Sequence, residues 1–138
     1  MKNRKKSLGF TLVELLAVIV ILAIVTLIAV PNVNGLIKKN KEKMFCQKIS
    51  SIESSAKNYA QDYYESITFN SNNEAGVRVS VLLEKGYIKA DSKETKAVTD
   101  PRSGDSLLNK IVTIKKINNR YYGSYNYDNN SDKELCSK

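Results

Sequence analysis

Few side chains in this sequence could do catalytic or metal chemistry. The 138 residues include no histidine and two cysteines, Cys46 and Cys136, which lie far apart in the chain. Without histidine, a serine or cysteine nucleophile lacks its usual general base. The wide cysteine spacing also differs from that of zinc sites. We therefore expect no catalytic residue, no metal site and no cofactor, and predict that the chain is not an enzyme.

Four aspartates are the remaining candidate ligands. Carboxylate oxygens are ligands that calcium prefers, but the spacing of these four residues does not match an EF-hand loop. We interpret them as solvated acids of surface turns: Asp100, Asp105, Asp128 and Asp132.

The two cysteines allow two interpretations. In an exported domain, one disulfide between Cys46 and Cys136 would tie the C-terminus back to the rest of the chain. Alternatively, both are unpaired thiols. The polar tail 128–138 would be loose without a tether, which favours the disulfide.

The longest apolar element that the sequence indicates is one segment near the N-terminus. From Phe10 to Val30 the sequence has a single ionisable side chain, Glu14. As a helix this segment would be about 31 Å long, enough to cross the hydrocarbon core of a bilayer. We predict a transmembrane helix over residues 10–30.

Positive charge flanks the apolar segment. The net charge is +8, and most of it lies in residues 1–9 and 38–48. The remaining stretch from Ile49 onward is nearly neutral, which argues against a general nucleic-acid surface. The positive-inside rule places residues 1–9 in the cytoplasm, although the second basic cluster weakly opposes that orientation.

Residues 1–30 admit three interpretations. The apolar run is too long for a secretory signal peptide, and no small-x-small cleavage site follows it. A plain signal anchor fits the length but leaves Glu14 unexplained, since a carboxylate among lipid chains is costly. The third interpretation is a processed membrane segment in which Glu14 has a charged partner.

The residues KKSLGFTLVELL, 5–16, support the third interpretation. They resemble the processing motif of type IV prepilins and their pseudopilin relatives. The resemblance implies a leader, residues 1–9, that a prepilin peptidase cuts off between Gly9 and Phe10. It also implies N-methylation of Phe10 and a role in assembly for Glu14.

The charges on either side of the proposed cut give a physical reason for this motif. Cutting after Gly9 would remove four positive charges and leave one α-amino cation at Phe10. In staggered side-by-side packing, Glu14 of one subunit can neutralise that amine on its neighbour. The pairing is worth more in lipid than in water, because both charges are otherwise poorly solvated there.

The apolar pattern continues beyond residue 30. Its steps of three and four are typical of one helical face, so we predict one helix from Phe10 to about Tyr63. Residues 31–63 are its amphipathic continuation, with a kink or loosening near Pro31 and Gly35. The apolar positions are Val33, Leu36, Ile37, Met44, Phe45, Ile49, Ile52, Ala56, Tyr59, Ala60 and Tyr63.

Residues 64–138 are predicted to form a globular head. We expect a loop over 66–76, a short helix closed by Gly86, and a turn over 100–106. Two antiparallel strands should meet in a tight hairpin at Asn118-Asn119. The predicted fold class is α+β: a long N-terminal helix packed on a small antiparallel sheet. We expect cross-strand packing from Tyr121, Tyr122, Tyr125 and Tyr127.

The resemblance implies a structural subunit of a type IV pilus or pilus-like filament. Its partners would be copies of itself and other pilins, the prepilin peptidase, and an assembly platform with its ATPase. The precursor would lie in the cytoplasmic membrane, and the assembled chain at the cell surface or in an extracellular filament. One alternative is a pseudopilin of a type II secretion or competence DNA-uptake system. Nucleic acid would be a partner only in a DNA-uptake filament. A second is a signal-anchored surface domain that does not polymerise.

Overall fold

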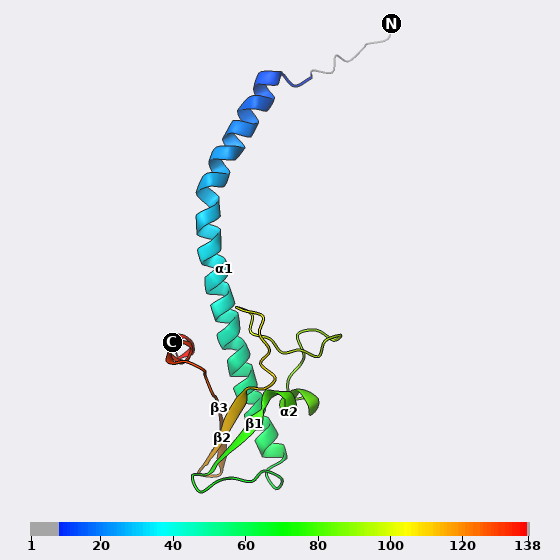
Figure 1. Cartoon of the computed structure of the whole chain (residues 1–138), viewed down its shortest axis with the longest axis vertical. Helices are drawn as coiled ribbons and strands as arrows, with labels where there is room; N and C mark the ends of the chain where they lie inside the picture. The colour runs from blue at the N-terminus through cyan, green and yellow to red at the C-terminus, as the bar shows by residue number, and fades with distance from the viewer. Residues whose placement is uncertain (1–8, 138) are drawn as a thin grey trace. The chain divides into compact units, whose positions relative to one another are not determined.

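The computed structural model describes residues 9–137, apart from the side chains of residues 29–32. The chain divides into two compact units, 1–38 and 39–138. The long helix α1 (Leu12–Asp62) continues from the first into the second (Figure 1). The expected fold class is confirmed, because α1 packs on a three-stranded antiparallel sheet. The remaining elements are β1 (Glu74–Arg78), α2 (Val79–Glu84), β2 (Ile111–Ile117), β3 (Arg120–Tyr125) and α3 (Asn130–Cys136).

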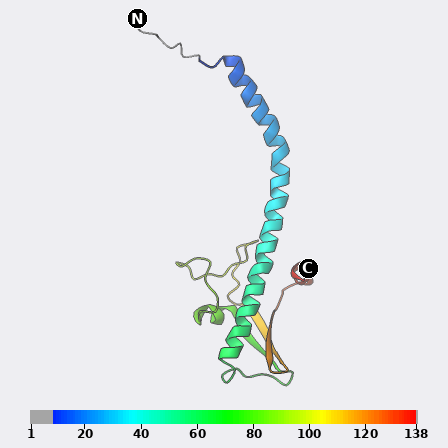
Figure 2. The ribbon, with the colours of Figure 1, turned by 180° about the vertical axis from the view of Figure 1, so that it is seen from behind.

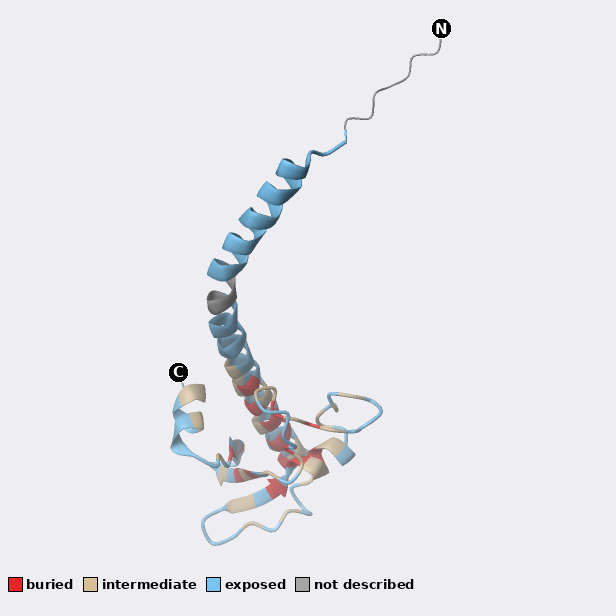
Figure 3. Ribbon diagram, turned by 45° about the horizontal axis from the view of Figure 1, so that its top comes forward, coloured by how far each residue is buried: buried red, intermediate tan, exposed pale blue. Residues whose placement is uncertain are grey.

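The helical face predicted for the second half of α1 forms one side of the head's core. Its buried residues recur at steps of three and four, as an amphipathic helix requires. Met44, which the apolar pattern placed on this face, is instead 55% exposed. The switch from exposed to buried residues along α1 is visible in Figure 3. The buried members are Phe45, Ile49, Ile52, Ala56 and Ala60.

The sheet has the strand order β1-β2-β3, with every pair antiparallel. Val112 and Ile114 alternate with exposed or half-buried neighbours and are fully buried, so one face of β2 is aliphatic and lines the core. Asn118 and Asn119 join β2 to β3 with φ values of 47° and 60°. Positive φ at both central residues is the mark of a type I′ hairpin turn, and asparagine tolerates it well.

One boundary in the head differs from expectation. Glu74, Ala75 and Gly76 belong to β1 and pair with β2, although their polar surroundings had indicated a loop. The predicted short helix exists as α2, and Gly86 follows it with φ of +80°. The amide of Gly86 donates to the Leu83 carbonyl, which closes the last turn.

The C-terminal tail contains a helix that the sequence did not indicate. Asn129 caps α3, since its side chain accepts a hydrogen bond from the Asp132 amide. Figure 2 shows α3 beside the second half of α1 and away from α2. Helix formation in so short a segment depends on docking, because isolated helices of this length are unstable in water.

The four tyrosines of the hairpin region do not act alike. Tyr121 and Tyr125 are buried against the helix side of the sheet, where Tyr125 packs edge-on against Tyr127. Tyr122 faces the other side and is 49% exposed. Tyr122 alternates with the buried positions of β3 and lies opposite Lys115 of β2 on the exposed face of the sheet.

Candidate functional site

The start of α1 brings together the residues singled out in the sequence. Gly9 and Phe10 precede the helix and are exposed, Phe10 by 80%. Helix α1 begins at Leu12, and Glu14 lies in its first turn. A carboxylate there is favoured by the partial positive charge of the helix N-terminus.

Thr11 contributes a feature that we had not predicted. Its hydroxyl oxygen accepts a hydrogen bond from the Glu14 amide at 3.2 Å, and its carbonyl accepts from the amides of Glu14 and Leu15. Thr11 is therefore the N-cap of α1. The signal was present in the sequence, because threonine followed three residues later by glutamate is the capping-box pattern.

The first half of α1 exposes a surface that is apolar apart from Glu14 and Thr26. The large apolar side chains from Leu12 to Ile28 are between 48% and 80% exposed within the chain. The polar hydroxyl of Thr26 donates to the carbonyls of Leu22 and Ala23, so it needs no partner outside the helix. A surface of this size in contact with water is unfavourable, which means that lipid or other helices must cover it.

Length and composition give the following result for membrane crossing. Among the described residues, no single helix is long and apolar enough to cross a membrane. The segments Leu12–Ile28 and Val33–Asp62 satisfy these criteria of length and composition only together, as a bent pair. The side chain of Pro31, where a kink was predicted, lies outside the described residues. Gly35 is helical, and a Cβ at this position would meet open space.

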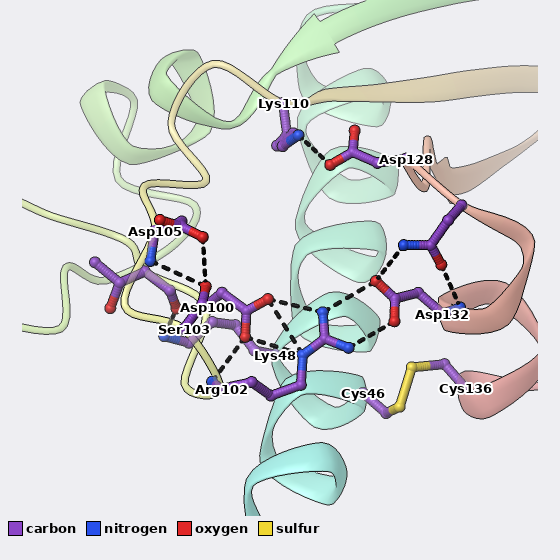
Figure 4. Close-up of polar contacts among 12 residues, drawn as sticks. Cys46, Lys48, Asp100, Arg102, Ser103, Asp105, Lys110, Asp128, Asp132 and Cys136 are labelled. Atoms are coloured by element: carbon purple, nitrogen blue, oxygen red, sulfur yellow. Dashed lines mark hydrogen bonds and ion pairs between the residues drawn. A yellow bond between two sulfur atoms is a disulfide. The ribbon is translucent and has the colours of Figure 1, made fainter.

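In the head, Arg102 connects three parts of the chain (Figure 4). Its guanidinium donates to both carboxylate oxygens of Asp100, with Nη2 to Oδ2 at 2.8 Å. It also donates to Asp132 of α3, with Nη1 to Oδ1 at 2.6 Å and Nη2 to Oδ2 at 3.0 Å. Its Cζ atom lies over the ring of Phe45 in α1, 3.5 Å from the ring centroid.

The charges of this cluster are mutually stabilising. Burial by itself would raise the pKa of the Asp100 carboxyl, but hydrogen bonds and the charge of Arg102 outweigh burial and hold the pKa below its usual value. For Asp132, the hydrogen bonds from Arg102 are the main cause of a lowered pKa. The same partners raise the pKa of Arg102, with the Asp132 contact first.

The interpretation of four solvated acids is wrong for Asp100 and Asp132. Asp100 is 8% exposed, and both carboxylates are neutralised by Arg102. Asp128 pairs with Lys110, and Asp105 accepts from Ser103. All four border one cleft of about 260 Å³. Within the described residues, no group of three or more His, Cys, Asp or Glu side chains could hold a metal ion.

Cys46 of α1 and Cys136 of α3 form a disulfide, which confirms the paired interpretation of the two cysteines. Their Cα atoms are 5.1 Å apart, a usual distance for a disulfide. Arg102 and the disulfide thus hold α3 at two separate points.

Comparison with known proteins bears on the N-terminal segment. Residues 4–30 match the family model of the prokaryotic N-terminal methylation motif, the type IV prepilin-type signature. No curated protein and no solved structure matches the chain significantly. The motif supports a type IV pilin-like or pseudopilin-like processed protein, and the helix-plus-sheet fold and the disulfide fit that class. The motif points to a structural protein whose precursor is anchored in a membrane.

Proposed function

We propose that this chain is a structural subunit of a type IV pilus or pilus-like filament. A prepilin peptidase cuts it between Gly9 and Phe10 and methylates the new amine of Phe10. The subunit then polymerises through the first half of α1. An assembly platform and its ATPase supply the energy, and the neighbours in the filament are copies of this chain and other pilins.

The observation that carries this proposal is the combination of Glu14 with the apolar surface behind it. Glu14 sits in the first helical turn, next to the proposed cut and within the matched motif. The large apolar side chains that follow it are largely exposed in the single chain. Packing them against neighbouring helices replaces lipid contact, and the Glu14 carboxylate is then close enough to neutralise a neighbour's Phe10 amine.

Mass spectrometry of the N-terminal peptide from filaments sheared off native cells tests the proposal. We expect abundant chains that begin with N-methylated Phe10 in the sheared fraction. Chains in the sheared fraction that still carry residues 1–9 would contradict the proposal and favour a signal-anchored surface domain.

The second candidate is a pseudopilin of a secretion or DNA-uptake system, which the same motif supports equally. It shares the cut and the methylation but forms a short filament that stays with the envelope. The same experiment separates the two, because methylated Phe10 chains found only in the membrane fraction would favour the pseudopilin.

A further inference from the structure

Three lysines surround α1 where the compact unit 39–138 begins. Lys39, Lys41 and Lys43 are all exposed. None of them forms an ion pair with any other described residue. Lys48, one turn further on, contrasts with them, because its ammonium group donates to Asp91 at 2.7 Å and to the Thr99 carbonyl at 2.7 Å. The head therefore neutralises Lys48 and leaves the three lysines, here named the lysine collar, without an acidic partner in the described chain.

The collar does not lie on one side of the helix. At about 100° per residue, Lys43 is about 40° from Lys39 around the helix axis, whereas Lys41 is about 200° from Lys39. A protein partner that docks on one face would meet only part of this set. A layer of anionic groups that encircles the helix would meet all of it.

The position of the collar along the chain fits such a layer. About 20 helical residues cross a hydrocarbon core, and counting them from Glu14 ends near Asn34. Lys39 to Lys43 then lie about 8–14 Å further along the helix. Lysine stems can extend back toward the headgroup layer, which lies outward of the hydrocarbon core.

We infer that the lysine collar binds the phosphate headgroups of anionic lipids on the outer face of the membrane while the chain waits for assembly. The inference rests on the proposed function, because it requires α1 to be inserted in a bilayer. Each lysine near an anionic surface is worth about 1 kcal/mol, or about fivefold in association. The collar therefore fixes how deeply α1 of the waiting subunit sits in the bilayer. It also makes the binding of the subunit to the membrane depend on the charge of the lipids.

The test uses the full-length precursor in phosphatidylcholine vesicles that contain spin-labelled phosphatidylglycerol or spin-labelled phosphatidylcholine. Electron paramagnetic resonance measures the fraction of each labelled lipid that is held at the protein surface. We expect a several-fold preference for phosphatidylglycerol, which falls in 1 M salt because the Debye length shrinks to about 3 Å. In the variant K39Q/K41Q/K43Q most of this preference should be lost, leaving only the part that the basic residues 1–9 maintain.

The matched control is K57Q/K89Q/K93Q, which removes the same charge from exposed positions of the head. It should retain the wild-type preference, and the basic residues 1–9 contribute equally to all three proteins. An unchanged preference in the collar variant, or an equal loss in the control, overturns the inference. Unchanged lipid preference with failed filament assembly would assign the collar to a neighbouring subunit instead. Failure of the wild-type chain to insert into vesicles would instead refute the proposed function, and the inference with it.

Discussion

Gly123 of β3 lies directly against the backbone of Glu53 in α1. A Cβ atom on Gly123 would come within 2.3 Å of the Glu53 carbonyl oxygen, a distance that no relaxed structure allows. The Glu53 carboxylate accepts a hydrogen bond from the Tyr125 amide at 2.8 Å, two residues along the same strand. This close approach lets α1 cover the sheet and also occupies part of the open edge of β3.

Gly123→Ala should therefore destabilise the head by about 1–3 kcal/mol, because the backbone of β3, of α1 or of both must move to make room for the Cβ atom. Thermal unfolding followed by circular dichroism measures the effect. Gly76→Ala is the control, since its Cβ would meet only a side-chain methyl group of Ile111 at 3.2 Å. Equal melting temperatures for Gly123→Ala and the wild type would show that the contact with Glu53 is looser than described.

Replacing Cys46 and Cys136 with serine should lower the free energy of unfolding by about 2–5 kcal/mol. The disulfide closes a loop of about 90 residues, and longer loops lose more entropy on closure. Chemical denaturation with and without a reducing agent measures this loss. The reducing agent should have no effect on the double-serine variant, and an equal effect on both proteins would contradict a stabilising disulfide.

Stability of the head should fall in acid because of Asp100 and Asp132. Their pKa values are lowered in the folded chain, so their contribution is complete above the ordinary aspartate pKa of about 4. It is lost as the pH falls from there through the lowered pKa values. In Arg102→Met the carboxylates lose their partner, so the acid-dependent loss should shrink while stability at neutral pH drops. A wild-type unfolding midpoint that stays constant between pH 5 and pH 2 would refute the role of the cluster.

Glu14→Ala should leave cleavage intact and reduce incorporation into filaments, because the variant cannot neutralise a neighbour's Phe10 amine. Quantifying sheared filaments and N-terminal peptides in parallel separates the two steps. Glu14→Asp is the control and should retain part of the assembly, since it keeps the charge on a shorter side chain. Normal filament yield from Glu14→Ala would rule out the pairing.

Gly9→Val should block cleavage, because a branched side chain hinders close contact between the peptidase and extended backbone at the proposed cut. Mass spectrometry of the membrane fraction should show only full-length precursor. Thr26→Val, also a change to valine, is the control and should be processed normally. A mature N-terminus at Phe10 in the Gly9→Val protein would show that Gly9 is not required.

Local signals in the sequence were sufficient for much of this protein. The motif around Gly9, Phe10 and Glu14 is contiguous, and the apolar run and the hairpin at Asn118-Asn119 depend on neighbours in the chain. The period of α1 likewise identified the buried positions from Phe45 to Ala60, whereas Val33, Leu36, Ile37 and Met44 of the same pattern are exposed. Such features follow from the conformational preferences and hydrophobicity of adjacent residues, which a single sequence contains in full.

Only the tertiary structure decided which distant groups meet. Arg102 and Asp132, Gly123 and Glu53, and Cys46 and Cys136 are far apart in the chain, and their contacts arise when the sheet and tail dock on α1. The same docking holds the polar tail as α3, and it pairs Arg102 with Asp100, which is buried, and with Asp132, which is half-buried. Burial and pairing are properties of the packed fold, because the same aspartate is solvated or neutralised according to what lies across from it.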